Sequence, residues 1–361
     1  MRLLQVNTIS FLVCVTTSAL FHASFVRLVN GATAAPLNQL VQQANKEGRV
    51  VYATSGETPE VVAEMNRRFN KKFNVNITVE SLPLTAAATV TRVLQEKSAN
   101  RLTIDLLHPS YTLMNRVAGK SVLAEFDWIN TFGTALPGIK EAATRVPDFL
   151  KNMVLDYQHL AYVPIYNTKL VSKTDVPKKW TDFLDQKWKG KKIIIDPRGN
   201  SLYLLFLAYG EEWALDFAGK MAQQDPLFES GQPAIARAVA KGEAPLGITN
   251  LSHILAYKKQ GLPVDAAPQE VVAIVPQVLV PVDGSPNPNA AKLFAAWVST
   301  EGLAFEEGND FSGRAWKGTN WALAKELDKV NAKLVFASSP KEIEMAEAMI
   351  ANVQKVLQRK R

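Results

Sequence analysis

The chain has 361 residues, of which 47% are hydrophobic, and a formal net charge of +7 at neutral pH. Its length suggests about two domains, and its apolar content is sufficient for a large core. The small excess of positive charge comes without a nucleic-acid-binding motif, which argues against DNA or RNA as a partner.

Residues 1–34 have the pattern of a secretory signal peptide. Arg2 precedes an apolar run over residues 9–25, and the small-residue motif 32–34 follows it. Hydroxyl residues and a histidine interrupt the run, so a permanent membrane helix fits it less well. We therefore predict cleavage after Ala34 and a periplasmic location. Because Cys14 is the only cysteine, the mature protein would have no disulfide and no thiolate metal site.

Strands and helices alternate through the next part of the chain. Thr58, Pro59 and Glu60 form a helix start, because Thr is a favoured N-cap, Pro suits the first helical position and an acid favours the first turn. Such alternation is typical of a parallel sheet that helices cover. The expected strands are 49–55, 76–82 and 102–109, and the expected helices are 37–46, 59–69, 87–97 and 111–119.

A second unit of the same kind begins near residue 159. Its last strand is a long apolar run, after which the pattern becomes helical to the end of the chain. The expected strands are 159–167, 193–196, 244–250 and 270–282, and the expected helices are one that begins at Ser201 and others at 234–242, 252–261, 289–302, 320–330 and 341–357.

Three expected strands end in small polar residues where a helix is expected to begin. These segments are 54–56, 196–201 and 249–252. The free N–H groups at a helix start attract anions, and ligands of open α/β sheets bind at the carboxyl ends of the strands. The serine in each segment could instead only cap its own helix. Three such segments in two units favour one shared cleft.

The sequence contains no recognisable catalytic or metal-binding pattern. His108, His159 and His253 are far apart and lack cysteine partners, and there is no P-loop or dinucleotide-binding glycine motif. The adjacent acids Glu306 and Glu307 would point in different directions on a helix, so they do not form an acid/base pair. We predict no metal, no cofactor and no enzymatic activity, although a catalytic triad assembled in space stays open.

Four segments give nearly the whole mature chain a resemblance to a known family. It resembles the extracellular solute-binding proteins of ATP-binding cassette (ABC) importers, and most of all their ferric-ion-binding branch, which has type 2 periplasmic-binding-protein topology. The segments are YNTKLV (166–171), WTDFLDQKWKGKKIIIDP (180–197), KGEAPLGITN (241–250) and SPNPNAAKLFAAWVSTEG (285–302).

The resemblance implies an α/β fold with two lobes, each a helix-covered and mostly parallel sheet, joined by two crossover strands. The lobes of such proteins close on a ligand about a hinge. Lobe 1 would comprise residues 35–162 and 276–361, and lobe 2 would comprise residues 163–275. The implied partners are a small-molecule ligand and an ABC permease in the inner membrane, and the protein itself would be a monomer.

The chain departs from the ferric branch at its metal ligands. Where that branch has two adjacent tyrosines, this chain has Leu251, Ser252 and His253. Segment 55–57, Ser-Gly-Glu, replaces the histidine that follows the first strand, and segment 109–110, Pro-Ser, stands where a glutamate can assist. Ferric iron prefers anionic oxygen ligands, so these departures argue against bare iron.

The remaining candidates are polar and, apart from Arg198, uncharged. We predict that they bind a small organic anion, a carboxylate, phosphate or phosphonate, with Arg198 as a bidentate partner. A solvated Arg198 beside an Asn200 that only shapes the turn is the alternative. An iron chelate and a secreted serine hydrolase also stay open, the latter with Ser201 or Ser252 near His253. The predicted ligand-binding residues are Ser55, Gly56, Ser110, Arg198, Asn200, Ser201, Asn250 and Ser252.

Overall fold

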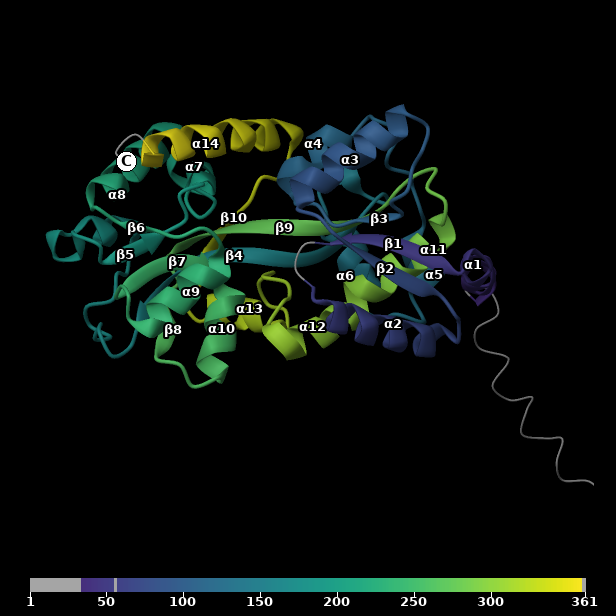
Figure 1. Cartoon of the computed structure of the whole chain (residues 1–361), viewed down its shortest axis with the longest axis horizontal. Helices are drawn as coiled ribbons and strands as arrows, with labels where there is room; N and C mark the ends of the chain where they lie inside the picture. The colour runs from purple at the N-terminus through teal and green to yellow at the C-terminus, as the bar shows by residue number, and fades with distance from the viewer. Residues whose placement is uncertain (1–33, 55–56, 359–361) are drawn as a thin grey trace, which may run out of the picture.

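Ten strands form one curled sheet within residues 34–54 and 57–358, the part of the chain that the computed structural model describes (Figure 1). The order along its main path is β2-β1-β3-β9-β4-β7-β5-β6, with β10 beside β9 and β8 beside β4. The strands are β1 (Arg49–Thr54), β2 (Thr78–Pro83), β3 (Leu106–Leu107), β4 (Leu155–Asn167), β5 (Ile193–Ile195), β6 (Leu227–Phe228), β7 (Leu246–Asn250), β8 (Val264–Ala266), β9 (Val271–Pro281) and β10 (Lys333–Val335).

Two long strands, β4 and β9, connect the two lobes. In lobe 1, β1 pairs in parallel with β2 and β3, and in lobe 2, β5 pairs in parallel with β6 and β7. β4 and β9 are antiparallel to each other and run through both lobes. This arrangement confirms the predicted α/β fold with two crossover strands. The predicted boundaries at 162/163 and 275/276 fall inside β4 and β9 and stay predictions.

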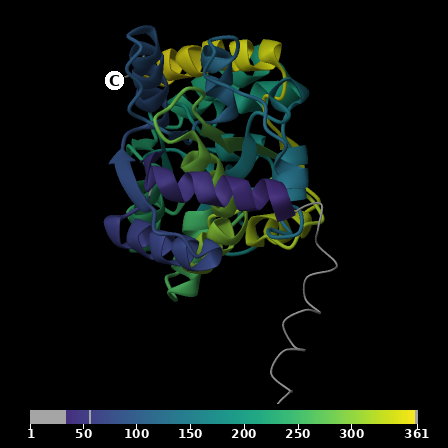
Figure 2. The same cartoon turned by 90° about the vertical axis from the view of Figure 1, so that its right-hand side faces the viewer.

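Helices cover the sheet, and one of them contacts both lobes. α14 packs against α8 and η5 of lobe 2 and against α4 and η1 of lobe 1, and α1 lies across the end of lobe 1 against α11 (Figure 2). The α-helices are α1 (Ala34–Glu47), α2 (Pro59–Phe73), α3 (Ala86–Ser98), α4 (Met114–Val117), α5 (Trp128–Phe132), α6 (Ile139–Thr144), α7 (Phe206–Tyr209), α8 (Glu211–Gln223), α9 (Gln232–Lys241), α10 (Leu251–Lys259), α11 (Pro288–Trp297), α12 (Leu303–Asp310), α13 (Ala322–Asp328) and α14 (Pro340–Gln358). The 3-10 helices are η1 (Tyr111–Leu113), η2 (Asp148–Leu150), η3 (Trp180–Leu184), η4 (Gln186–Trp188) and η5 (Tyr203–Leu205), and η6 (Val298–Gly302) is a π-helix.

The start of α2 is set by the residues that the sequence indicates. Thr58 is extended, and its hydroxyl accepts a hydrogen bond from the backbone N–H of Val61 at 3.4 Å, while Pro59 occupies the first turn. Asn74 ends the helix in the left-handed conformation at a φ of 51°. The prediction of a helix start at Thr58 is therefore confirmed, and α2 extends one turn beyond the expected end.

The prediction that a helix begins at Ser201 is wrong. The chain makes a turn there, which η5 and the four-residue helix α7 follow, and Gly210 ends α7 at a φ of 90°. Residues 202–206 are all buried in the core that α14 covers, so the run lacks the polar face of an amphipathic helix. Segment 196–201 therefore presents no helix N-terminus within the described chain.

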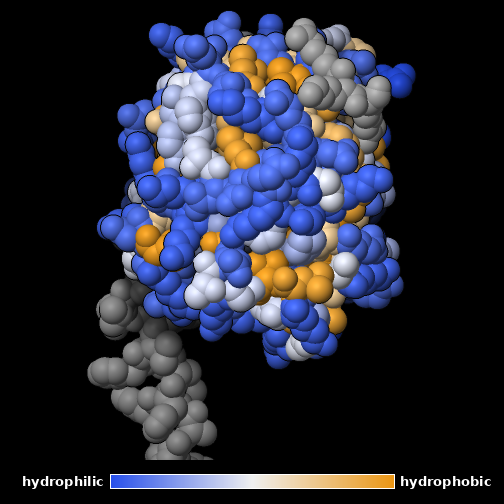
Figure 3. Space-filling model, turned by 90° about the vertical axis from the view of Figure 1, so that its left-hand side faces the viewer, coloured by the Kyte–Doolittle hydropathy of each residue, from blue (hydrophilic) through white to orange (hydrophobic). Residues whose placement is uncertain are grey.

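The described surface is mainly polar. Figure 3 views the molecule from the lobe 2 end, where hydrophilic residues cover most of the face between apolar patches. None of the described helices combines the length and apolar character needed to cross a bilayer. The predicted signal peptide, residues 1–34, lies outside the described residues except for its last residue.

Candidate functional site

A pocket of about 460 Å³ lies between the lobes. Lobe 1 contributes residue 57 and the start of α2, α12 forms part of the same wall, and lobe 2 contributes the start of α10. β4 and β9 form its floor. Its volume lies within the range of small-molecule sites, and the residues that follow β3 and β7 place it at the carboxyl ends of strands.

The lobe 2 wall is built where β7 runs directly into α10. Asn250 is the last residue of β7, and its Oδ1 accepts a hydrogen bond from the backbone N–H of Ala161 at 3.1 Å, which fixes the side chain. Ser252, in the first turn of α10, is only 5% exposed and lines the pocket. Among the described residues, none forms a hydrogen bond with the Ser252 hydroxyl. This wall therefore offers the pocket neutral polar groups.

The opposite wall is acidic. Glu57 and Glu306 line the pocket, and Asp310 lies at the end of α12 beside them. The Tyr157 hydroxyl donates to Glu306 Oε2 at 2.5 Å and lies 3.4 Å from Glu57 Oε1, so one phenol contacts both carboxyl groups. The Tyr52 hydroxyl lies 3.3 Å from Glu57 Oε1. Two carboxyl groups and two phenols thus share one corner of the pocket.

Burial and like charge change the titration of this corner. Burial raises the pKa of Glu306 well above its usual value, and the neighbouring charge of Glu57 raises it further. Burial likewise raises the pKa of Tyr157, and the charge of Glu306 adds to that effect. On the other wall, burial lowers the pKa of His253. The pocket therefore holds Glu306 with a bound proton more readily than an ordinary glutamate, and His253 is neutral near pH 7.

The floor is a hydrogen-bonded set of one histidine and two glutamine side chains. His108 Nε2 lies 2.6 Å from Gln277 Oε1, and Gln158 Nε2 donates to the same oxygen at 3.0 Å. Since that amide oxygen only accepts, His108 carries its proton on Nε2. Leu160 adds an apolar surface to the floor. The polar side chains of the floor therefore hold one another in position through hydrogen bonds.

The structure brings only part of the predicted site to this pocket. Asn250 and Ser252 line it, while Ser110, Arg198, Asn200 and Ser201 are not among its lining residues. Residues 55–56, which include the predicted Ser55 and Gly56, lie outside the described part of the chain.

The turn at residues 196–201 has a structural role. Asp196 is fully buried and accepts hydrogen bonds from the backbone N–H of Arg198 at 2.9 Å and from its guanidinium at 2.6 Å. Gly199 has a φ of 74°, and a Cβ there would lie 2.7 Å from a methyl group of Val353 on α14. Arg198 thus neutralises Asp196 and the turn packs against α14, so Arg198 and Gly199 both have structural roles.

Sequence reasoning missed Glu57 and Glu306 as site residues. The divergence expected for Glu306 and Glu307 is confirmed, because Glu307 Oε1 accepts from the backbone N–H of Ala322 away from the pocket. Glu306, however, lies near Glu57, which is distant in sequence, and both contact the Tyr157 hydroxyl. Only the departure at residue 57, where a glutamate follows the first strand, could have indicated an acidic pocket.

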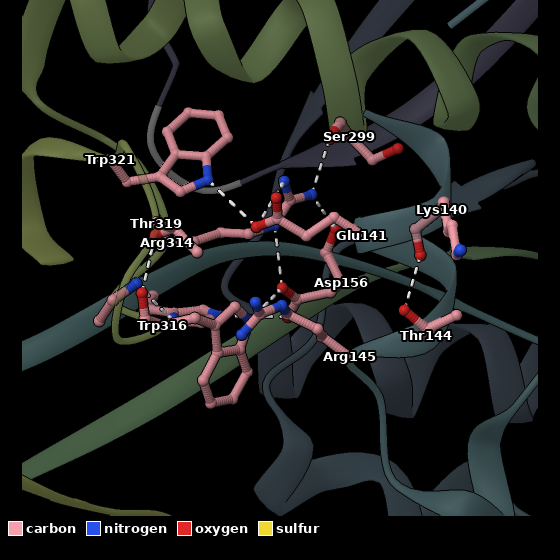
Figure 4. Close-up of polar contacts among 12 residues, drawn as sticks. Lys140, Glu141, Thr144, Arg145, Asp156, Ser299, Arg314, Trp316, Thr319 and Trp321 are labelled. Carbon is pink, nitrogen blue, oxygen red and sulfur yellow. Dashed lines mark hydrogen bonds and ion pairs between the residues drawn. The ribbon is translucent and has the colours of Figure 1, made fainter. Parts of the chain in front are cut away.

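A buried ionic cluster links β4, one of the two strands that connect the lobes, to the segment after α12 (Figure 4). We call Asp156, His159, Arg314 and Trp316 the hinge cluster. Arg314 Nε lies 2.9 Å from Asp156 Oδ2, and the indole N–H of Trp316 donates to the same oxygen at 2.8 Å. His159 Nδ1 accepts from the backbone N–H of Ala315 at 2.9 Å, which leaves Nε2 to donate to Asp156 Oδ1 at 3.1 Å. The segment after α12 is thereby fixed along the edge of β4.

Comparison with known proteins places the chain among binding proteins. The model of the family described as bacterial extracellular solute-binding protein matches residues 64–304, which is more than half of the chain. An uncharacterised protein of Haemophilus influenzae is 30% identical over 155 residues, 40% of this chain and 45% of that relative. The chain thus spans less than half the length of the curated relative that it matches.

Solved structures of similar fold cover nearly the whole of their own chains. The iron-bound protein HitA of Pseudomonas aeruginosa has a TM-score of 0.67 at 18% identity, over 85% of this chain and 99% of that one. The periplasmic binding protein AfuA of Actinobacillus pleuropneumoniae, solved with fructose-6-phosphate, has a TM-score of 0.62 at 18% identity, with the same coverage of 85% and 99%. At such identities the likeness establishes the fold.

Proposed function

This chain belongs to the family of bacterial extracellular solute-binding proteins, and we propose that it captures one small organic solute between its lobes and delivers it to an ABC importer. The protein would work in the periplasm, with the permease in the inner membrane as its partner. The observation that carries the proposal is the pocket of about 460 Å³ between the lobes, whose floor is formed by the two strands that connect them. A solute there contacts both lobes and so favours their closed arrangement.

The charges of the pocket argue against the lone anion predicted from the sequence. None of the described residues that line it is a lysine or arginine, whereas three are carboxylic acids. The Arg198 guanidinium pairs with Asp196 rather than facing the pocket. The start of α10 with Ser252 is the remaining feature that suits a negatively charged or other hydrogen-bond-accepting group. We therefore propose an organic solute whose acceptor end lies there.

Two alternatives have less support from the geometry. For an iron cargo, no group of three histidine, cysteine or acidic side chains that could hold a metal occurs among the described residues. For the hydrolase, Ser201 is buried with its hydroxyl unpaired, and Ser252 and His253 are neighbours on α10, where adjacent side chains diverge. Within the described chain, neither Ser201 nor Ser252 forms a hydrogen bond with a histidine.

Native mass spectrometry of protein purified from the periplasm tests the proposal. We expect one retained small molecule that disappears after unfolding and refolding in its absence. A Ser252→Trp variant fills the pocket with an indole and should lose the molecule, whereas Ser172→Trp, on an exposed loop, should keep it. Circular dichroism establishes that both variants are folded. Retention of the molecule by folded Ser252→Trp would contradict the assignment of this pocket.

A further inference from the structure

The solute of this pocket can be assigned to a chemical class from the groups that face it. Resting on the proposed function, we infer that it carries a positively charged nitrogen, which binds between Glu57 and Glu306, and a polar acceptor at the other end, which binds at Ser252. The solute is then an organic cation or a zwitterion, rather than the free carboxylate or phosphate expected from the sequence.

Glu306 and Asp310 bring acidic groups to this corner that no lysine or arginine of the described chain pairs with. Glu306 is 4% exposed. The Tyr157 hydroxyl contacts a carboxyl oxygen of both Glu306 and Glu57, so this one phenol oxygen bridges the two carboxyl groups. Two carboxylates at this spacing, of which that of Glu306 is almost fully buried, repel unless a proton or a cation lies between them. A bound ammonium group supplies that cation.

The opposite wall is an independent observation that also indicates a ligand. Ser252 is about 95% buried, lines the pocket and has no hydrogen-bond partner among the described residues. Because its hydroxyl is not fully enclosed, it reaches the pocket, and without a protein partner its hydrogen bond must go to water or to a ligand. An acceptor atom of the solute at this position would accept this bond, together with those of the free N–H groups of the first turn of α10.

The remaining groups that face the corner do not reverse its sign. His108 donates through Nε2 to Gln277 Oε1. His253, across the pocket, is held neutral by burial, and Asp310 adds a further negative charge. The phenols of Tyr52 and Tyr157 stay protonated because burial raises the pKa of both. The solute therefore meets carboxyl groups on one wall and hydrogen-bond donors on the other.

The chemical charge of the co-purified solute is the first test. The compound released by unfolding should be retained by a cation-exchange resin at acidic pH, and its mass should contain a basic nitrogen. A released compound without a basic nitrogen would overturn the inference and leave the proposed function intact. Absence of any bound or bindable compound would instead count against the proposed function itself.

Paired variants provide the second test, using the solute so identified. Glu306→Gln keeps the acceptor for Tyr157 but removes the charge, and we expect it to weaken binding about 10- to 100-fold. Glu307→Gln is the matched control, because its side chain bonds the backbone of Ala322 outside the pocket, and binding should be unchanged. Equal affinities for the wild type and Glu306→Gln, measured by calorimetry, would overturn the cation assignment even if the solute contains nitrogen.

Discussion

In the polar turn at residues 196–201, the contacts of single residues indicate a structural role. Arg198 has the chemistry to bind an anion, yet its partner is Asp196 two residues earlier. Gly199 is needed for two reasons, since its φ of 74° lies in the left-handed region and a Cβ would clash with Val353. The turn whose sequence suggests an anion-binding site thus packs against α14.

Replacing Gly199 tests the structural role of this turn. Gly199→Ala should destabilise the protein by about 2–4 kcal/mol, because left-handed backbone and overpacking against Val353 both oppose the methyl group. Gly119→Ala is the matched control, with a φ of 71° and no atom within 4 Å of the added carbon, and should cost about 1 kcal/mol. Urea unfolding measures both. Equal losses would mean that contact with α14 contributes nothing.

Among the secondary-structure elements, β4 contributes residues both to the pocket and to the hinge cluster. It pairs with β9 along the hinge, and a bulge between Asp156 and His159 shifts its register there. The bulge lets Tyr157 and Gln158 both serve the pocket while Asp156 and His159 join the hinge cluster. The backbone N–H of His159 donates to Gly313 O, so the segment after α12 covers a strand edge that has no neighbouring strand in this part of the described sheet.

The hinge cluster should be the most sensitive ionic group in the protein. Arg314→Met should cost about 3–5 kcal/mol of unfolding free energy, because it leaves the fully buried Asp156 without its cation. Arg49→Met removes one partner of an ion pair whose side chains are about half exposed, and should cost at most about 1 kcal/mol. Denaturant titration checks both values. Similar losses for the two variants would show that Asp156 is neutralised by other groups.

At the scale of the whole molecule, ligand capture joins two lobes whose contributions to the pocket differ in charge. The acidic corner comes from Glu57 with α12, the neutral donors come from α10, and β4 with β9 lies between them. Closing the lobes on a cation would therefore change the protonation of Glu306 as well as the shape of the molecule. Solute capture and proton release are expected to be coupled.

Calorimetry in two buffers of different ionisation enthalpy tests this coupling. Burial and the charge of Glu57 raise the pKa of Glu306, which favours a proton on this carboxyl group in the free pocket, and a bound ammonium group would displace that proton. Binding near pH 7 should release protons, and affinity for a permanently charged solute should rise with pH until the raised pKa of Glu306 is passed. Glu306→Gln should abolish the release. Binding heats that are the same in both buffers would show that no proton leaves.

The sequence by itself determined the alternation of strands and helices and the start of α10 after β7, whereas the two crossover strands were implied by the resemblance to solute-binding proteins. The alternation and the helix start depend on local periodicity, capping residues and runs such as β9, which is buried along its whole length and therefore reads as one apolar segment. Where burial was equally complete but the run was short, at residues 202–206, periodicity failed and a helix was expected that does not form.

Only the tertiary structure decided the charge of the pocket. Glu57 and Glu306 belong to distant parts of the chain, and no local pattern relates them, but the fold brings both to the hydroxyl of Tyr157. The same folding pairs Arg198 with Asp196, and Arg198 is not among the residues that line the pocket. Electrostatic interactions act through space and vary with burial, so the sign of a site is a property of the folded arrangement.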